Sequence, residues 1–139
     1  MSTTLVVDTG QTIVGILSAD DESYVAYYGP DIAAAIVRLE EVDEFVTYNG
    51  CIRDIPDLES FSWLHRGRGF QPKGAHTDMR LLVWSDEIWG SNLYDTYLRY
   101  FPAVPKFPDT FEGRNQKDVC VTLRLWQAWK AGRISDQRK

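Results

Sequence analysis

The first 28 residues consist of three short segments rich in β-forming residues, joined by links too short to contain a helix. The segments are Leu5–Asp8, Thr12–Leu17 and Ser23–Tyr28. The links are Gly10-Gln11, which has the composition of a hairpin turn, and the polar run Ser18–Glu22. Strands joined by such short links pair antiparallel, because a parallel pairing needs a much longer crossover. The sequence therefore predicts a three-stranded antiparallel meander in which Asp8 ends the first strand.

A helical segment and a fourth strand follow the meander. Gly29-Pro30 breaks the strand pattern. Asp31 then has the position of an N-cap for a helix over about residues 32–40. The next β-forming run is Phe45–Tyr48. A strand–helix–strand passage implies a parallel pairing with a right-handed crossover. We therefore expect a mixed sheet, in which parallel strands are added to an antiparallel meander.

The stretch from Tyr48 to Pro56 has the pattern of a strand end, a tight turn and a helix start. Asn49-Gly50 is a turn signal, because both residues tolerate a positive φ angle. Pro56 suits the first helical turn, where its missing N–H is not needed, so Asp54 lies at the start of a helix. Asp54 could simply cap that helix, since Asp is a preferred N-cap residue. It could also be functional, because sites in open α/β sheets gather at the carboxyl ends of the strands.

The remaining elements are helical segments, one further strand and two loops. In chain order they are a helix at Ile55–Leu64, a glycine-rich loop at Arg66–Gly74, a strand at Ala75–Met79, helical segments at Arg80–Trp89 and Asn92–Tyr100 separated by Gly90, a loop at Pro102–Pro108 and a helix at Lys117–Ala131. No repeat or low-complexity tract interrupts them, so residues 1–139 are predicted to form a single domain. The predicted fold class is α/β, with a mixed sheet flanked by helices.

Composition limits the classes of function. Of the 139 residues, 44% are hydrophobic, which is enough for a folded core. No apolar run approaches the roughly 18 residues of a membrane span, and the chain does not start like a signal peptide. We therefore expect no membrane association and a cytoplasmic location. The two cysteines, Cys51 and Cys120, form no CxxC pair and are expected to be buried structural thiols. The net charge of −5 disfavours a nucleic-acid binder unless bound cations neutralise its carboxylates.

Three aspartates stand at the ends of elements that are far apart in the sequence. Asp8 ends the first strand, Asp54 follows a later strand, and Asp118 opens the last helix. Hard divalent cations such as Mg²⁺ and Mn²⁺ take oxygen ligands. Two such ions about 4 Å apart can hold the attacking and leaving oxygens of a phosphodiester. The pattern therefore indicates metal-dependent phosphodiester chemistry, and unrelated caps and turns are the alternative.

The segments around these aspartates resemble the motifs of the DEDD 3′–5′ exonucleases of the ribonuclease H-like superfamily. The resembling segments are Leu5–Asp8, Thr47–Pro56 and Asn115–Val119. The resemblance implies a ribonuclease H-like fold with a five-stranded mixed sheet flanked by helices. It also implies that Asp8, Asp54 and Asp118 are catalytic and hold Mg²⁺ or Mn²⁺ in a two-metal site. The implied activity is removal of nucleotides from the 3′ end of single-stranded DNA or RNA.

Two positions depart from the family pattern. The first motif of the family is Asp-x-Glu, whereas this chain has Gly10 in place of the Glu and so lacks that metal ligand. Before its third aspartate the family carries a Tyr or His that orients or deprotonates the attacking water, and those positions are Arg114 and Gly113. Such an enzyme could be slow, or could recruit His76 or Asp78. The alternative is a catalytically impaired member of the fold that serves as a nucleic-acid-binding or protein-interaction module.

Candidate substrate-binding residues lie in two places. Arg66, Arg68 and Lys73 crowd the glycine-rich loop, where they could hold phosphates. The alternative is a solvated loop with no such role. Asn49 could contact substrate through its amide, although it also suits the turn. Four tryptophans fit core or interface positions better than a base-stacking platform: Trp84, Trp89, Trp126 and Trp129.

Overall fold

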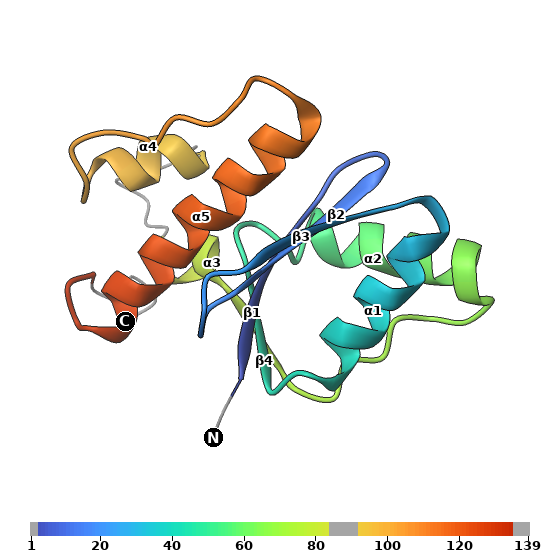
Figure 1. Cartoon of the computed structure of the whole chain (residues 1–139). Helices are drawn as coiled ribbons and strands as arrows, with labels where there is room; N and C mark the ends of the chain where they lie inside the picture. The colour runs from blue at the N-terminus through green and yellow to red at the C-terminus, as the bar shows by residue number, and fades with distance from the viewer. Residues whose placement is uncertain (1–2, 84–91, 135–139) are drawn as a thin grey trace.

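The computed structural model describes residues 3–83 and 92–134. Its strands are β1 (Thr4–Thr9), β2 (Ile13–Ser18), β3 (Tyr24–Tyr28), β4 (Glu44–Thr47) and β5 (Ala75–Asp78). They form one five-stranded sheet in the order β3-β2-β1-β4-β5 (Figure 1). β2 pairs antiparallel with both β1 and β3, whereas β4 pairs parallel with both β1 and β5. The predicted antiparallel meander and the predicted mixed sheet are both confirmed.

Helices cover both faces of the sheet. They are the 3₁₀ helix η1 (Gly29–Asp31), α1 (Ile32–Glu41), α2 (Asp54–Arg66), α3 (Met79–Val83), α4 (Leu93–Leu98) and α5 (Phe111–Lys130). α1 and α2 lie on one side of the sheet and α5 lies on the other (Figure 1). The helix predicted over residues 80–89 is described only as far as Val83, so Trp84, Trp89 and Gly90 lie outside the described residues. Within the described ranges, no helix has the length and apolar character needed to cross a membrane.

The start of α5 differs from the sequence-based prediction. The helix begins at Phe111 rather than Lys117. Thr110 causes the earlier start, because its side-chain oxygen accepts a hydrogen bond from the N–H of Gly113 at 2.9 Å and so caps the helix. As a result, Asp118 lies well inside the helix and not at its opening, and its side chain is presented from a continuous helical face.

Two smaller predictions need correction. Asp31 occupies the N-cap position of α1 as predicted, but its side chain makes no capping hydrogen bond, because Asp31 belongs to the 3₁₀ turn that runs directly into the helix. Cys51 is exposed, because it lies in the turn between β4 and α2, and Cys120 on α5 is only partly buried. Neither thiol is therefore a fully buried structural group.

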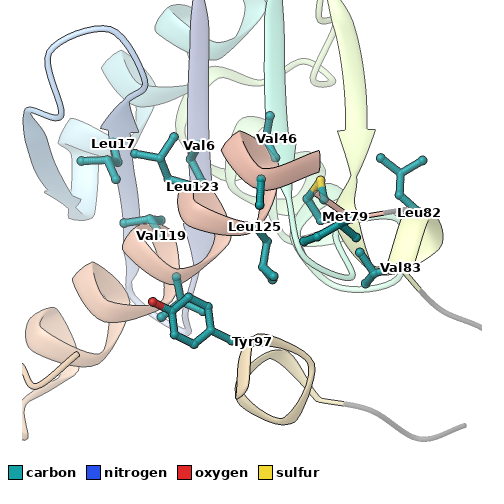
Figure 2. Packing of buried hydrophobic residues seen from close by; sticks show 13 residues of the cluster. Val6, Leu17, Val46, Met79, Leu82, Val83, Tyr97, Val119, Leu123 and Leu125 are labelled. Atoms are coloured by element: carbon teal, nitrogen blue, oxygen red, sulfur yellow. The ribbon is translucent and has the colours of Figure 1, made fainter. Parts of the chain in front are cut away.

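Two hydrophobic cores lie on opposite faces of the sheet. The core under α5 includes Val6, Val46, Val119, Leu123 and Leu125 (Figure 2). The core under α1 and α2 includes Leu5, Val7, Ile16, Ile36, Phe45 and Leu58. Trp126 and Trp129 pack against the first core, as predicted. The sheet is therefore the middle layer of three, and each face is sealed by its own set of apolar side chains.

Neighbouring residues of β1 point to opposite layers. Val6 belongs to the core under α5, whereas Val7 belongs to the core under α1 and α2. Side chains alternate along a strand, so Asp8 continues on the α5 side and Thr9 on the α2 side. These two consecutive residues therefore meet different helices, and this determines which acidic groups each of them can contact.

Candidate active site

A cavity of about 520 Å³ opens beside the carboxyl ends of β1 and β4, between the start of α2 and the face of α5. Its polar lining includes Asp8, Asn49, Arg53, Arg80, Tyr94 and Asp118. These side chains come from separate segments of the chain, and the topology of the sheet brings them to one edge. This is the edge at which open α/β sheets commonly bind ligands.

Asp8 and Asp118 form a carboxyl pair at the cavity. The two side chains lie close enough to interact directly, and the interaction with Asp118 raises the pKa of Asp8. Burial raises the pKa of Asp8 well above its ordinary value, and the negative charges of Asp54 and Asp118 raise it further. Burial also raises the pKa of Asp118. The pair therefore keeps a proton at pH values where exposed aspartates are fully ionised.

Asp54 approaches this pair from the other side of the sheet. Its Oδ1 accepts hydrogen bonds from the backbone N–H of Thr9 at 3.1 Å and from the Thr9 hydroxyl at 2.8 Å. Asp54 is the first residue of α2 and is only 3% exposed. Burial raises its pKa to about 6, although the hydrogen bonds from Thr9 act in the opposite direction. The carboxylate therefore ties α2 to β1, and it is not part of the cavity lining.

The Thr9 hydroxyl also contacts a second carboxylate. Its Oγ1 lies 2.7 Å from Oδ2 of Asp57 as well as 2.8 Å from Oδ1 of Asp54. A hydroxyl has a single proton to donate, so Thr9 shares it between two carboxyl groups of α2. Thr9 is therefore bound to the first turn of α2 at two points.

Tyr94 on α4 is a direct neighbour of Asp118 that the sequence did not single out. The Tyr94 hydroxyl donates a hydrogen bond to Oδ1 of Asp118. This hydrogen bond lowers the pKa of Asp118 and so opposes the effect of burial. Burial in turn raises the pKa of Tyr94, which keeps the phenol protonated and able to donate. The Lys117 ammonium lies 4.8 Å from the centre of the Tyr94 ring and adds a cation–π contact.

The positions where the family resemblance places a Tyr or His do not reach the carboxyl pair. Arg114 forms an exposed ion pair with Asp109 at 3.0 Å. Gly113 is buried in the first turn of α5 and has no side chain. Tyr94 therefore supplies a phenol to this site from a different helix. No pattern within residues 93–98 marks it, because its placement depends on how α4 docks against α5.

Asn115 sets the orientation of Asp8. Its Nδ2 donates to the backbone carbonyl of Asp8 at 2.9 Å and to Oδ2 of Asp8 at 3.3 Å, while its Oδ1 accepts from the hydroxyl of Tyr24 at 2.7 Å. Gly15 is paired with Asp8 across the β-ladder and leaves the space that the amide fills. The amide is 4% exposed, and both of its polar atoms have partners. The position of the Asp8 carboxylate is therefore fixed from α5.

Asn49 and Asp78 together shape the turn that precedes α2. Asn49 has a left-handed φ of 66°, and its N–H donates to Oδ1 of Asp78 at 2.7 Å. Asp78 also accepts from the N–H of Cys51 at 3.2 Å and from the N–H of Arg80 at 3.0 Å. Asp78 is therefore occupied with three backbone donors and does not enter the cavity. Asn49 does line the cavity, and its predicted contact with substrate stays a prediction.

His76 is also remote from the carboxyl pair. Its Nε2 lies 2.8 Å from Oγ1 of Thr47, and its ring stacks on Phe45 with the ring centres 4.7 Å apart. Burial lowers the pKa of His76, so the ring is neutral at physiological pH. It is absent from the lining of the cavity that contains Asp8. His76 therefore belongs to the packing of the sheet.

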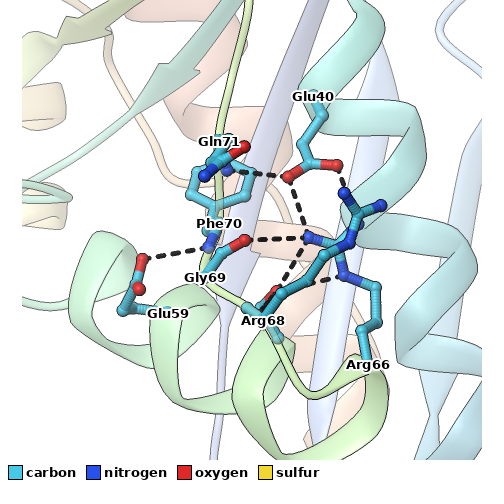
Figure 3. Close-up of polar contacts among 8 residues, drawn as sticks. Glu40, Glu59, Arg66, Arg68, Gly69, Phe70 and Gln71 are labelled. Atoms are coloured by element: carbon cyan, nitrogen blue, oxygen red, sulfur yellow. Dashed lines mark hydrogen bonds and ion pairs between the residues drawn. The ribbon is translucent and has the colours of Figure 1, made fainter.

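The glycine-rich loop is held by a buried ion pair. Arg66 donates to both carboxylate oxygens of Glu40, at 2.7 and 2.8 Å, and to the carbonyl of Gly69 at 3.1 Å (Figure 3). The two charged side chains are only 8% and 10% exposed. The structure therefore gives Arg66 a structural partner in place of the predicted phosphate. Arg66 and Asp54 are the opposite ends of α2, roughly 18 Å apart at the usual helical rise.

Arg68 and Lys73 lie in the same loop and share its position at the far end of α2. The loop backbone is also held from α2, since the N–H of Phe70 donates to Glu59 at 3.1 Å (Figure 3). Neither Arg68 nor Lys73 lines the cavity. The structure thus brings together Asp8, Asp118 and Asn49, with Asp54 close by, and it leaves the loop cations apart from them. Binding of substrate by these cations stays a prediction.

The chemistry of the carboxyl pair suits a hard divalent cation. Asp8 and Asp118 offer oxygen ligands to the cavity, and the raised pKa of Asp8 means that a proton competes with a cation for these ligands. Asp54 is turned toward Thr9. Within residues 3–83 and 92–134, no three His, Cys, Asp or Glu side chains are grouped to hold one metal ion. The residues therefore fit an ion with two protein ligands, the other positions being left to water or substrate, and do not form a complete two-metal site.

No family model matches the chain, and no curated protein matches it either. A function for this protein must therefore be proposed from the geometry of the cavity and its carboxyl groups.

Proposed function

We propose that the protein is a metal-dependent phosphodiester hydrolase with a ribonuclease H-like fold, which removes nucleotides from the 3′ end of single-stranded DNA or RNA. The observation that carries the proposal is that Asp8 and Asp118, from separate segments of the chain, line one cavity and lie close enough to influence each other's pKa. Asp54 lies close enough for its charge to raise the pKa of Asp8. The strand order supports the proposed fold, because an antiparallel meander continues into two parallel strands beside the acidic edge.

Asp8 and Asp118 are the residues that would hold Mg²⁺ or Mn²⁺. When bound, such an ion supplies a Lewis acid for a phosphoryl oxygen and lowers the pKa of a bound water. Asn115 holds Asp8 and Tyr94 holds Asp118, so both carboxylates are oriented in advance. Asp54 adds negative charge that attracts a cation. Because the pKa values of Asp8 and Asp118 are raised, metal binding should release protons to the solvent.

A second candidate function has its own support. Thr9 holds Asp54 away from the cavity, and Gly10 offers no ligand. A Cβ atom on Gly10 would lie 2.8 Å from Cγ2 of Ile13, so a larger residue there would require Ile13 to move. A chain with only two well-placed metal ligands could bind single strands without cleaving them. The alternative is therefore a catalytically impaired nucleic-acid-binding or protein-interaction module.

Degradation of an end-labelled single-stranded oligonucleotide tests the proposal. The wild-type protein is incubated in Mg²⁺ and separately in Mn²⁺, beside the double variant Asp8→Asn with Asp118→Asn. Asp109→Asn is the matched control, because the Asp109 side chain is 89% exposed and lies outside the cavity lining. We expect a ladder that shortens from the 3′ end in the wild-type and control reactions and disappears in the double variant.

Two results would count against the hydrolase. Cleavage that survives in the double variant would indicate a contaminating nuclease. Absence of cleavage with retained binding of the oligonucleotide would favour the impaired module. Metal-dependent melting separates these cases further, because an ion that binds only the folded state raises the melting temperature. An unchanged melting temperature in a large excess of Mn²⁺ would show that the folded protein does not bind the proposed metal ion.

A further inference from the structure

Arg53 is held at the cavity by the backbone of the turn that begins at Asn49. The N–H of Arg53 donates to the carbonyl of Asn49 at 3.1 Å. Asp78 fixes the same turn by accepting from the N–H groups of Asn49 and Cys51. Arg53 is the last residue before α2, its side chain is exposed, and it lines the cavity. The position of Arg53 at the cavity is therefore set by the backbone of this turn.

The guanidinium of Arg53 lies near the carboxyl groups of the site. Its positive charge lowers the pKa values of Asp8, Asp54 and Asp118, which burial raises. Among the described residues, however, the Arg53 side chain makes no hydrogen bond and no ion pair within 4 Å. Arg66 differs in this respect, because its donors are taken by Glu40. Arg53 thus carries donors that residues 3–83 and 92–134 do not use.

We infer that Arg53 binds the phosphate group of the substrate in this cavity, an inference that rests on the proposed hydrolase function. A phosphodiester is repelled by the carboxylates of Asp8 and Asp118 and needs a positive group on the same cavity. The planar fork of a guanidinium matches two phosphate oxygens at once. Arg80 is a second cation in the lining, and it comes from α3 on the other side of the turn. The cavity therefore presents acids and arginines together, as a bound metal and a phosphate would require.

The competing explanation is that Arg53 only offsets the negative charge of the acids. In that case its removal would raise the pKa values of Asp8, Asp54 and Asp118 without changing the number of phosphate contacts. The two explanations differ in the salt dependence of binding. Each phosphate contact to a single strand contributes about 0.7 to the slope of log K against log salt concentration. A charge that acts only within the protein contributes nothing to that slope.

The test measures binding of fluorescein-labelled oligothymidylate by fluorescence anisotropy, in Ca²⁺ and over a series of salt concentrations. We expect Arg53→Gln to weaken binding about tenfold or more, as loss of a charged hydrogen bond should, and to lower the slope by about 0.7. Arg53→Lys should restore the slope but only part of the affinity, because Lys cannot bind two oxygens in a fixed plane. Arg133→Gln is the matched control, because Arg133 is exposed beyond the end of α5 and outside the cavity lining, and it should change neither quantity.

Mn²⁺ binding by the same proteins separates failure of this inference from failure of the proposed function. Arg53→Gln removes a positive charge near the acids, so titration calorimetry should show tighter Mn²⁺ binding in the variant. If the wild-type protein binds Mn²⁺ and oligothymidylate, but Arg53→Gln binds oligothymidylate with unchanged affinity and slope, the inference alone is overturned. Equal losses in Arg53→Gln and Arg133→Gln would also overturn it. If the wild-type protein binds neither ligand, both the function and the inference fail.

Discussion

The side-chain oxygen of Asn115 occupies the space that a Cβ atom on Gly15 would fill. Gly15→Ala should therefore expel the amide from its position between Asp8 and Tyr24. Loss of these buried hydrogen bonds should lower the free energy of unfolding by about 1–3 kcal/mol, measured by urea denaturation. In the background Asn115→Ala the same substitution should cost much less, because the space is already empty. Equal costs in both backgrounds would contradict this coupling.

The pH dependence of stability should be unusual in the absence of metal. A carboxyl whose folded pKa is raised contributes stability below its unfolded pKa and loses it as pH rises through the folded pKa. For Asp54, whose pKa moves from 3.8 to about 6, the loss is about 3 kcal/mol. The Asp8 and Asp118 pair acts in the same direction. The free energy of unfolding in EDTA should therefore fall as pH rises from about 4 to about 7.

Asp8→Asn should remove much of the fall in the free energy of unfolding with rising pH. The metal-free variant should therefore be more stable than wild type at pH 8. Asp21→Asn is the control of opposite sign. Hydrogen bonds from Ser23 lower the pKa of the exposed Asp21, so its small contribution is lost as pH falls. Urea denaturation at several pH values measures both variants. A wild-type profile that rises with pH, or an Asp8→Asn variant that is less stable at pH 8, would contradict the raised pKa values.

Tyr94→Phe should shift the pH range in which the protein binds metal to higher values. The hydroxyl of Tyr94 lowers the pKa of Asp118, so its loss leaves that carboxyl protonated over a wider pH range. Mn²⁺ titration calorimetry at several pH values should show weaker binding in the acidic range and nearly unchanged binding at alkaline pH. Tyr97→Phe, on the same helix, is the control, because the Tyr97 hydroxyl makes no hydrogen bond among the described residues. A uniform loss at every pH would indicate a structural defect in place of the predicted pKa change.

Arg66→Met should destabilise the protein without changing its affinity for an oligonucleotide. The substitution leaves Glu40 buried without its partner, which typically costs about 3 kcal/mol or more. Replacing both residues with methionine should recover much of that loss. Asp109→Asn, which breaks the exposed pair with Arg114, should cost less than about 1 kcal/mol. If Arg66→Met instead weakens oligonucleotide binding at unchanged stability, the loop does contact substrate.

The layout of the sheet could be predicted because short links and β-forming runs leave few pairings for the first three strands. The crossover through α1 then fixes β4 beside β1. The start of α5 was missed because the proline-containing loop before it conceals the local capping signal at Thr110. Capping depends on one hydrogen bond, whereas strand pairing is repeated over many residues. Boundaries are therefore less visible in a sequence than the order of the elements.

The site was predicted unevenly for a similar reason. Asp8 lies near the end of its strand as predicted, whereas Asp118 lies inside α5, and the fold brings the two residues together. Asp54 lies apart from the pair because side chains alternate along β1. Its partner Thr9 therefore points to the α2 side of the sheet, whereas Asp8 points to the α5 side. Tyr94 and Arg53 reach the cavity through the docking of α4 and the geometry of a turn, and no local pattern encodes either contact. The loop arginines looked available only because Glu40, which pairs with Arg66, is distant in the sequence.

The adjacency of Asp8 and Thr9 has a consequence for how the molecule responds to a ligand. One residue is linked to α5 and the next to α2, although these helices lie on opposite faces of the sheet (Figure 1). Two consecutive residues of one strand thus join two layers that are otherwise packed separately. A cation at the cavity should slow amide hydrogen exchange in the first turn of α2 and around the middle of α5 together. The stabilisation of α5 and α2 would then be coupled through β1, without any change in the backbone conformation of the strand.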